Sequence, residues 1–84
     1  MNIILDVIEF KILNDFEILL KFENNEVKKI SLQHLLNEKP FSALQNKNIF
    51  NLAYIENGTI CWPQDIDIAP EYLYNNSFST DSEI

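Results

Sequence analysis

The segment from Gly58 to Tyr74 constrains the fold of this chain more than any other, because it joins a tight-turn signal to two rigid prolines. It contains the only glycine, cysteine and tryptophan of the chain and two of its three prolines. Asn57-Gly58 is the strongest short hairpin signal, since both residues accept the positive φ of a two-residue turn. We therefore predict that residues 52–56 and 59–62 form a β-hairpin.

The two prolines are expected to mark where strand pairing ends and where a helical turn begins. Pro63 lacks an amide hydrogen, so we expect pairing to stop there. Ile66 and Ile68 then alternate with acidic residues, and Pro70 suits the first turn of a helix. The side chains predicted to lock this turn onto the sheet are Tyr72, Leu73 and Tyr74.

The first part of the chain predicts a three-stranded antiparallel meander. Its strands are expected at residues 3–13, 16–22 and 27–32. In the first of them the apolar positions change from odd to even midway, which predicts a bulge near Val7 and Ile8. The Asn24-Asn25 pair accepts the positive φ of a tight turn and is expected to join the second strand to the third.

A helical period follows the meander. Leu32, Leu35 and Leu36 are spaced as one face of a short helix. Pro40 suits the first turn of a second helix, which is expected to end near residues 46–48.

These elements predict a small α+β domain with a mainly antiparallel sheet. A chain of 84 residues buries only about 60 to 65% of its unfolded surface and has one core to build. We assign residues 1–75 to a single domain made of the meander, one or two short helices, the second hairpin and a C-terminal helical turn. Residues 76–84 are predicted to be a polar tail that does not pack.

The charge of the chain is strongly uneven. Its net charge is -7, and all six of its basic residues are lysines that lie within residues 1–47. Residues 48–84 contain six acids and no basic residue. This balance argues against direct nucleic-acid binding, which depends on phosphate contacts from Lys and Arg. It favours a basic protein partner instead.

The chain is expected to be a cytoplasmic protein. One cysteine cannot form an internal disulfide, and the N-terminus does not have the pattern of a signal peptide. The apolar runs are far shorter than the ~20 residues that a membrane helix needs. We therefore expect no membrane association.

The residue types that carry chemistry do not form a recognisable catalytic or metal motif. Cys61 and His34 are the only thiol and imidazole, and neither lies in a segment that would bring them together. Asp65, Asp67 and Glu71 could contribute to a hard-cation site, but calcium loops bend at a glycine that this segment lacks. Local capping or solvation of these carboxylates is the alternative. We expect no enzyme activity, no metal and no cofactor.

Six residues are the candidates for partner binding. Four are acids with no lysine nearby in sequence, and two are aromatic: Glu56, Asp65, Asp67, Glu71, Trp62 and Tyr74. Two positions are considered for Trp62: it either anchors the core or belongs to an exposed aromatic patch. The Lys28-Lys29 pair is expected to form a solvated strand edge that blocks aggregation.

The chain resembles the bacterial domain of unknown function 2442 family. The residues that carry the resemblance are Gly58-x-Ile60-x-Trp62-Pro63 and Asp67-Ile68-x-Pro70-x-x-Leu73-Tyr74, with Leu20-Lys21-Phe22, Ile30-Ser31-Leu32, Pro40 to Leu44 and Phe50 upstream. The similarity covers roughly residues 5 to 75. Two positions depart from the family pattern. Gln64-Asp65 stands where Asn-Gly is usual, which questions the turn after Trp62, and Asn24-Asn25 replaces a usual glycine.

The resemblance implies a small α+β domain similar to the N-terminal domain of a Nitrosomonas protein that typifies the fold. It also implies a domain without established catalytic residues, often encoded beside a small toxin-like protein. The leading hypothesis is therefore a non-catalytic, antitoxin-like module that binds a basic protein through its acidic C-terminal half. The alternative is a homodimer that forms through a strand edge near residues 3–13 or through the Trp62 surface.

Overall fold

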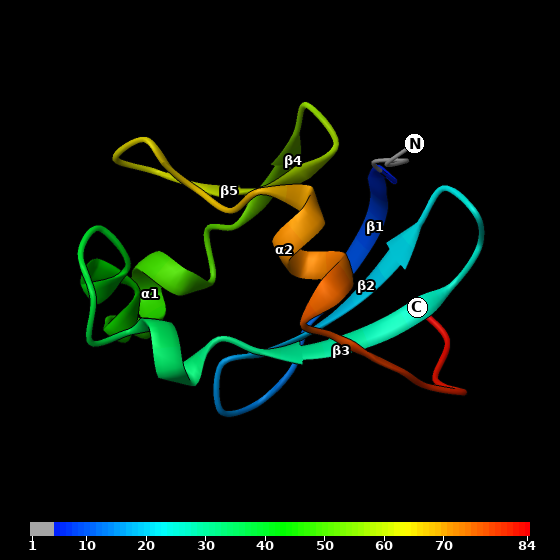
Figure 1. Ribbon diagram of the computed structural model, residues 1–84. Helices are drawn as coiled ribbons and strands as arrows, with labels where there is room; N and C mark the ends of the chain where they lie inside the picture. The colour runs from blue at the N-terminus through cyan, green and yellow to red at the C-terminus, as the bar shows by residue number, and fades with distance from the viewer. Residues whose placement is uncertain (1–4) are drawn as a thin grey trace.

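The computed structural model describes residues 5–84 as two antiparallel sheets with short helical segments (Figure 1). The larger sheet has the order β1-β2-β3-β7, and its strands are β1 (Val7–Ile12), β2 (Glu17–Phe22), β3 (Val27–Ser31) and β7 (Phe78–Ser79). The smaller sheet has the order β4-β5-β6, with β4 (Tyr54–Glu56), β5 (Thr59–Trp62) and β6 (Ile66–Asp67). The predicted α+β class, the meander and the second hairpin are confirmed.

The bulge predicted in the first strand is present. Val7 pairs with Phe22 and Glu9 pairs with Lys21, so Ile8 is the extra residue and is 47% exposed. After the bulge, the even-numbered apolar side chains of β1 pack against the core. The predicted strand began at residue 3, but residues 3 and 4 lie outside the described part of the chain.

The helical segments are shorter and tighter than the sequence predicts. They are the 3-10 turns η1 (Gln33–Leu35) and η2 (Phe41–Gln45) and the α-helices α1 (Lys47–Phe50) and α2 (Pro70–Asn75). The segment expected to be one helix from Pro40 to residues 46–48 is broken at Asn46, which has an extended ψ of 109°. The Asn46 side chain accepts a hydrogen bond from Asn48 N–H and starts α1 as an N-cap. Among residues 5–84, no helix is long and apolar enough to cross a membrane.

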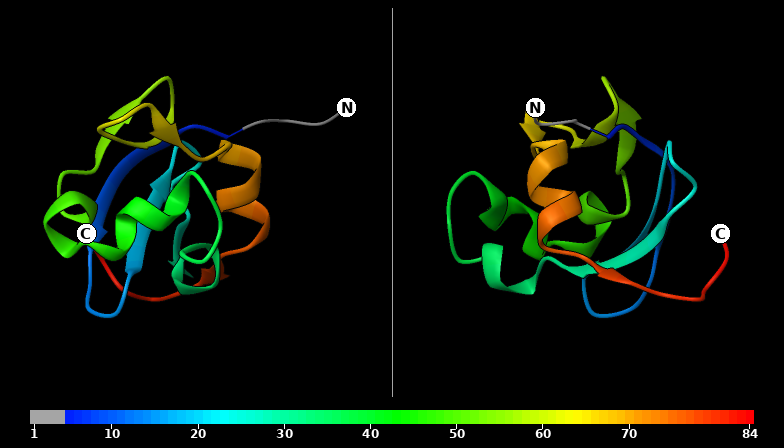
Figure 2. Two further views of the ribbon diagram at one scale, coloured as in Figure 1. Left: turned by 90° about the vertical axis from the view of Figure 1, so that its left-hand side faces the viewer. Right: turned by 45° about the vertical axis from the view of Figure 1, so that its right-hand side comes forward.

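The core lies between the two sheets and the helical segments, which cover one side of the larger sheet (Figure 2). Trp62 is completely buried there, and its Nε1–H donates to the Phe50 carbonyl oxygen over 2.9 Å. The two rings have centroids 5.8 Å apart. Trp62 is therefore a core anchor, and the alternative of an exposed Trp62 patch is wrong.

The chain stops pairing at Pro63 as predicted, because β5 ends at Trp62. It turns through residues 63–65, and β6 then pairs with β5, so that Trp62 lies opposite Ile66 and Cys61 opposite Asp67. Gln64 and Asp65 adopt φ values of 73° and 59°, which is the left-handed conformation that the usual Asn-Gly adopts more easily. The turn is therefore formed despite its unusual residues.

Part of the C-terminal segment packs, contrary to the expectation of an unpacked tail from residue 76. Ser77 is buried, and Phe78 and Ser79 pair with Lys29 and Lys28 of β3. Thr80 N–H extends the pairing by donating to the Val27 carbonyl oxygen over 3.1 Å. This pairing was missed because a two-residue strand has no periodicity of its own and depends on the free edge of β3.

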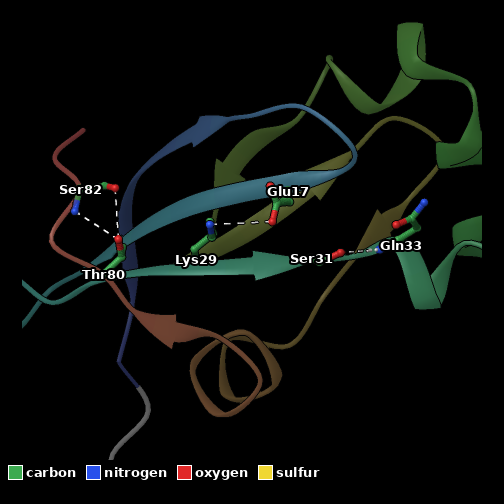
Figure 3. A network of polar contacts seen from close by, with 6 residues as sticks. All are labelled: Glu17, Lys29, Ser31, Gln33, Thr80 and Ser82. Carbon is green, nitrogen blue, oxygen red and sulfur yellow. Dashed lines mark hydrogen bonds and ion pairs between the residues drawn. The ribbon is translucent and has the colours of Figure 1, made fainter.

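The addition of β7 also changes the environment of the Lys28-Lys29 pair. Strand alternation sends these side chains to opposite faces. Lys29 lies on the outer face, where it pairs with Glu17 at 4.0 Å and where Ser31, Gln33, Thr80 and Ser82 make local hydrogen bonds (Figure 3). Lys28 is only 9% exposed, so the expectation of a solvated lysine edge is wrong for this residue.

Candidate protein-binding surface

The outer face of the smaller sheet collects polar side chains because strand alternation and cross-strand pairing act together. Tyr54 pairs with Cys61, Cys61 pairs with Asp67, and Glu56 pairs with Thr59. Directly paired residues share a face of the sheet, so all five side chains lie on the same side. The intervening side chains of β5, Ile60 and Trp62, face the core.

This outer face forms a hollow of about 200 Å³, which we call the acidic pocket. Its polar lining residues are Tyr54, Glu56, Asn57, Thr59, Cys61, Asp65 and Asp67, and the buried Trp62 and Ile66 also border it. Three of these carry carboxylates, and no basic residue is among the described residues that line it. The pocket therefore concentrates the negative charge of the C-terminal half.

The charge of the pocket affects its two weakly acidic groups. Desolvation raises the pKa of the Tyr54 hydroxyl, and the nearby charges of Glu56, Asp65 and Asp67 raise it further. Burial likewise raises the pKa of the Cys61 thiol, with Asp67 and Glu56 adding to the effect. A negative field of this kind stabilises a cation and keeps the thiol protonated.

The thiol and the imidazole of the chain lie in different parts of the molecule. Cys61 Sγ lies 3.8 Å from the Glu56 carbonyl oxygen and 4.0 Å from that of Thr59. His34 Nε2 instead lies 2.7 Å from the Tyr72 hydroxyl oxygen, in another part of the molecule. Within residues 5–84, no group of three or more His, Cys, Asp or Glu side chains is arranged to hold a metal ion.

The structure places four of the six residues predicted for binding at the acidic pocket, and three of these four are exposed. Glu56, Asp65 and Asp67 line the acidic pocket, whereas Glu71 is exposed in the first turn of α2 and does not line it. Trp62 has no exposed surface with which to contact a partner. Tyr54, Thr59 and Cys61 were missed as pocket residues, although the alternation around Asn57-Gly58 places them on the face of Glu56.

Tyr74 belongs to a structural cluster outside the pocket. Its hydroxyl donates to Glu26 Oε1 over 2.6 Å, and its ring contacts Phe22 edge to face with centroids 5.0 Å apart. Lys28 Nζ donates to the Tyr74 carbonyl oxygen. These contacts hold the end of α2 against the larger sheet. They give Tyr74 a structural role that does not require a binding partner.

A second hollow, which we call the apolar groove, lies next to the acidic pocket. It has a volume of about 220 Å³ and is lined by Leu35, Phe41, Asp67, Ile68, Ala69 and Tyr72. These residues come from η1, from η2 and from the chain that runs from the end of β6 into α2. No local sequence pattern predicts the groove, because its three walls are far apart along the chain.

The sheets, the helical turns and the two adjoining hollows define a small α+β domain whose candidate site is a surface depression lined by acidic and apolar residues. A family model described as "Protein of unknown function (DUF2442)" matches residues 7–79. The chain belongs to this family, which confirms the resemblance and extends it through β7. No curated protein and no solved structure shows a significant match to the chain.

Proposed function

We propose that this domain is a non-catalytic protein-binding module whose acidic pocket receives a Lys or Arg side chain of a basic partner. The observation that supports the proposal is the placement of Glu56, Asp65 and Asp67 around one hollow, with no lysine in residues 48–84 to neutralise them. Complementary charge of this kind accelerates association and selects among partners. The partner in this proposal is a small toxin-like protein, which the domain inhibits by occlusion.

The proposal includes the absence of catalysis. Burial raises the pKa of the Cys61 thiol, the charges of Asp67 and Glu56 raise it further, and the hydrogen-bond acceptors of the sulfur are carbonyl oxygens. A nucleophilic thiol needs the opposite environment, with positive charge nearby. Because this thiol is free, a reducing compartment such as the cytoplasm suits the domain.

Co-expression with the protein encoded next to this chain tests the proposal. We expect a complex that survives size-exclusion chromatography at low salt and weakens as salt is added. Two proteins that migrate independently at low salt would contradict the proposal.

Substitutions that remove carboxylates test whether the charges of the acidic pocket bind the partner. Glu56→Gln with Asp67→Asn is expected to weaken the complex by about tenfold or more. Glu71→Gln with Asp81→Asn is the matched control, because it also removes two exposed carboxylates but both lie outside the pocket, and we expect a change of less than about twofold. Equal weakening by both variants would show that only the net charge is recognised.

The second candidate function is self-association through a strand edge. β1 is an edge strand of the larger sheet and exposes Ile8 at its bulge. A bulge disturbs the ladder that a second copy would need, so this proposal is weaker. Light scattering over a wide concentration range tests it, and a constant monomer mass would exclude it.

A further inference from the structure

We infer that the acidic pocket and the apolar groove form one docking surface for a short partner segment. That segment carries a Lys or Arg side chain for the pocket and, a few residues away, an aliphatic or aromatic side chain for the groove. The inference rests on the proposed function and names the chemistry of the partner segment.

The two hollows adjoin each other, because one residue lines both of them. Asp67 lines both of them, while Cys61 opposite it belongs to the pocket and Ile68 and Ala69 after it belong to the groove. Asp67 is exposed and stands where the end of β6 leads into α2. A segment in the groove therefore has at least the Asp67 carboxylate of the pocket within reach.

The sizes of the hollows favour side chains over a cofactor. Small-molecule sites usually enclose about 300 to 1,000 Å³. The pocket and the groove have about 200 and 220 Å³. Each hollow is thus suited to one side chain, and a peptide segment can supply both.

The groove is preformed, which lowers the entropy cost of binding. Ile68 is 4% exposed, its N–H donates to the Ile60 carbonyl oxygen over 3.3 Å, and its own carbonyl oxygen accepts a hydrogen bond from the Thr59 hydroxyl. Leu35, Phe41 and Tyr72 are half-buried against the core. The Tyr72 hydroxyl is also held by His34.

Charge decides which apolar segment fits. Glu56, Asp65 and Asp67 line the pocket, Asp67 also lines the groove, and no basic residue is among the described residues that line either hollow. A segment with an acidic residue next to its apolar anchor would meet like charge at the pocket, which costs affinity. The surface therefore selects a segment that is both basic and apolar.

Amide chemical shifts of the full ¹⁵N-labelled chain test the inference with defined peptides. The probes are acetyl-Gly-Lys-Gly-Leu-Gly-amide and the same peptide with two glycines between Lys and Leu. One control replaces Lys by Glu and another replaces Leu by Gly. Two side-chain contacts correspond to a Kd of about 1 mM or weaker, so the titration extends to about 10 mM.

We expect at least one Lys-Leu peptide to shift amides of both hollows, from Tyr54 to Asp67 and from Ile68 to Tyr72. The Lys→Glu control is expected to bind at least about fivefold more weakly, and the Leu→Gly control is expected to leave the groove amides unchanged. Shifts in the pocket alone would overturn this inference and leave the proposed function standing. Shifts in neither hollow would count against both this inference and the proposed function. Groove binding of equal strength by the Lys→Glu control would contradict the inference that the partner segment is basic.

A variant that fills the groove separates docking from folding. Ala69 is exposed and lines the groove, so Ala69→Gln is expected to abolish the groove shifts while the rest of the spectrum is preserved. Leu52→Gln is the matched control, because Leu52 is 57% exposed and lines neither hollow. Unchanged peptide binding by Ala69→Gln would overturn the inference.

Discussion

Lys28 Nζ donates a hydrogen bond to the Tyr74 carbonyl oxygen over 2.6 Å and lies 3.9 Å from the centroid of the Tyr74 ring. One ammonium group thus satisfies a carbonyl near the end of α2 and makes a cation–π contact with the same residue. Because Lys28 is on β3, the pair joins the larger sheet to the helix that carries Tyr72 of the apolar groove.

Replacing Lys28 by Met is expected to destabilise the domain by about 2 kcal/mol, because the charged hydrogen bond and the cation–π contact are both lost. The measurement is the free energy of unfolding from urea denaturation. Lys29→Met is the matched control at the next residue. Lys29 is exposed and has only a 4.0 Å ion pair with Glu17, so we expect a loss below about 0.5 kcal/mol. An equal loss of unfolding free energy in the two variants would show that the Lys28 contacts do not stabilise the domain more than the exposed Lys29 does.

Glu26 is expected to make the domain less stable in acid. The hydrogen bonds from Tyr74 and then Asn24 lower the pKa of Glu26, with the charge of Lys28 adding to them. A carboxylate with a lowered folded pKa stabilises the protein above its unfolded pKa of about 4.3, and this contribution is lost as the pH falls through the folded pKa. Unfolding measured across this range should be less pH-dependent in Glu26→Gln. An unchanged slope would contradict the assignment.

The hydrogen bond between Tyr74 and Glu26 also predicts how the stability of the domain changes in alkali. It raises the pKa of the Tyr74 hydroxyl above its ordinary value of about 10. A raised folded pKa contributes stability below the unfolded pKa, and that stability is lost as the pH rises through the folded pKa. Tyr74→Phe should therefore reduce the pH dependence of unfolding above about pH 10. A tyrosine titration by ultraviolet absorbance checks the pKa directly.

Gly58→Ala is expected to cost about 2 kcal/mol, since left-handed backbone is unfavourable for a residue with a Cβ. Gly58 has a φ of 75°, and a Cβ there would overlap the Asp6 carboxylate. Its carbonyl oxygen also accepts from Val7 N–H over 2.8 Å, so a shift would disturb β1. Thermal and urea unfolding measure the loss. Asn57→Gly, at a φ of 53°, is the control and should change stability by less than about 0.5 kcal/mol.

Gln64→Asn is expected to stabilise the domain by about 0.5 kcal/mol, because Asn tolerates a positive φ better than Gln does. Gln64 has a φ of 73° and is exposed, so the side chain itself contributes little to packing. Gln33→Asn is the control, since Gln33 is exposed in η1 and its φ is not positive. A gain of similar size at Gln33 would refute the conformational explanation.

Cys61 is expected to react slowly with iodoacetamide near neutral pH. Burial raises the pKa of its thiol, and Asp67 and Glu56 raise it further, so little thiolate forms. The alkylation rate in the folded protein should be at least about tenfold below that of a small thiol, and the two rates should agree in denaturant. Rapid labelling of the folded domain would contradict the raised pKa of the Cys61 thiol. It would then favour a nucleophilic role for this residue.

The features predicted correctly depend on neighbours in sequence. Asn57-Gly58 predicts its hairpin because the positive φ of a two-residue turn is a local requirement, and β4 and β5 do pair around it. The bulge near Ile8 was visible as a change in the phase of alternation. Glu56, Asp65 and Asp67 line one pocket for the same reason, because β4, β5, the turn before β6 and β6 follow one another along the chain.

The features that were missed depend on residues far apart in sequence. The 3-10 turns have the apolar spacing of an α-helix, and only packing selects the tighter form. The burial of Lys28 depends on Tyr74, and the pairing of Phe78 depends on the free edge of β3. The apolar groove needs η1, η2 and α2 side by side.

The sequence by itself determined the α+β class, the two hairpins, the bulge and the uneven charge, because each follows from short-range periodicity, turn conformation or composition. Only the tertiary structure decided that Trp62 faces inward, that Glu71 lies apart from the pocket and that Asp67 joins the pocket to the groove. These outcomes depend on how the two sheets and the helical turns pack together. Packing is a property of the whole chain, since each buried surface is completed by residues that no local pattern specifies.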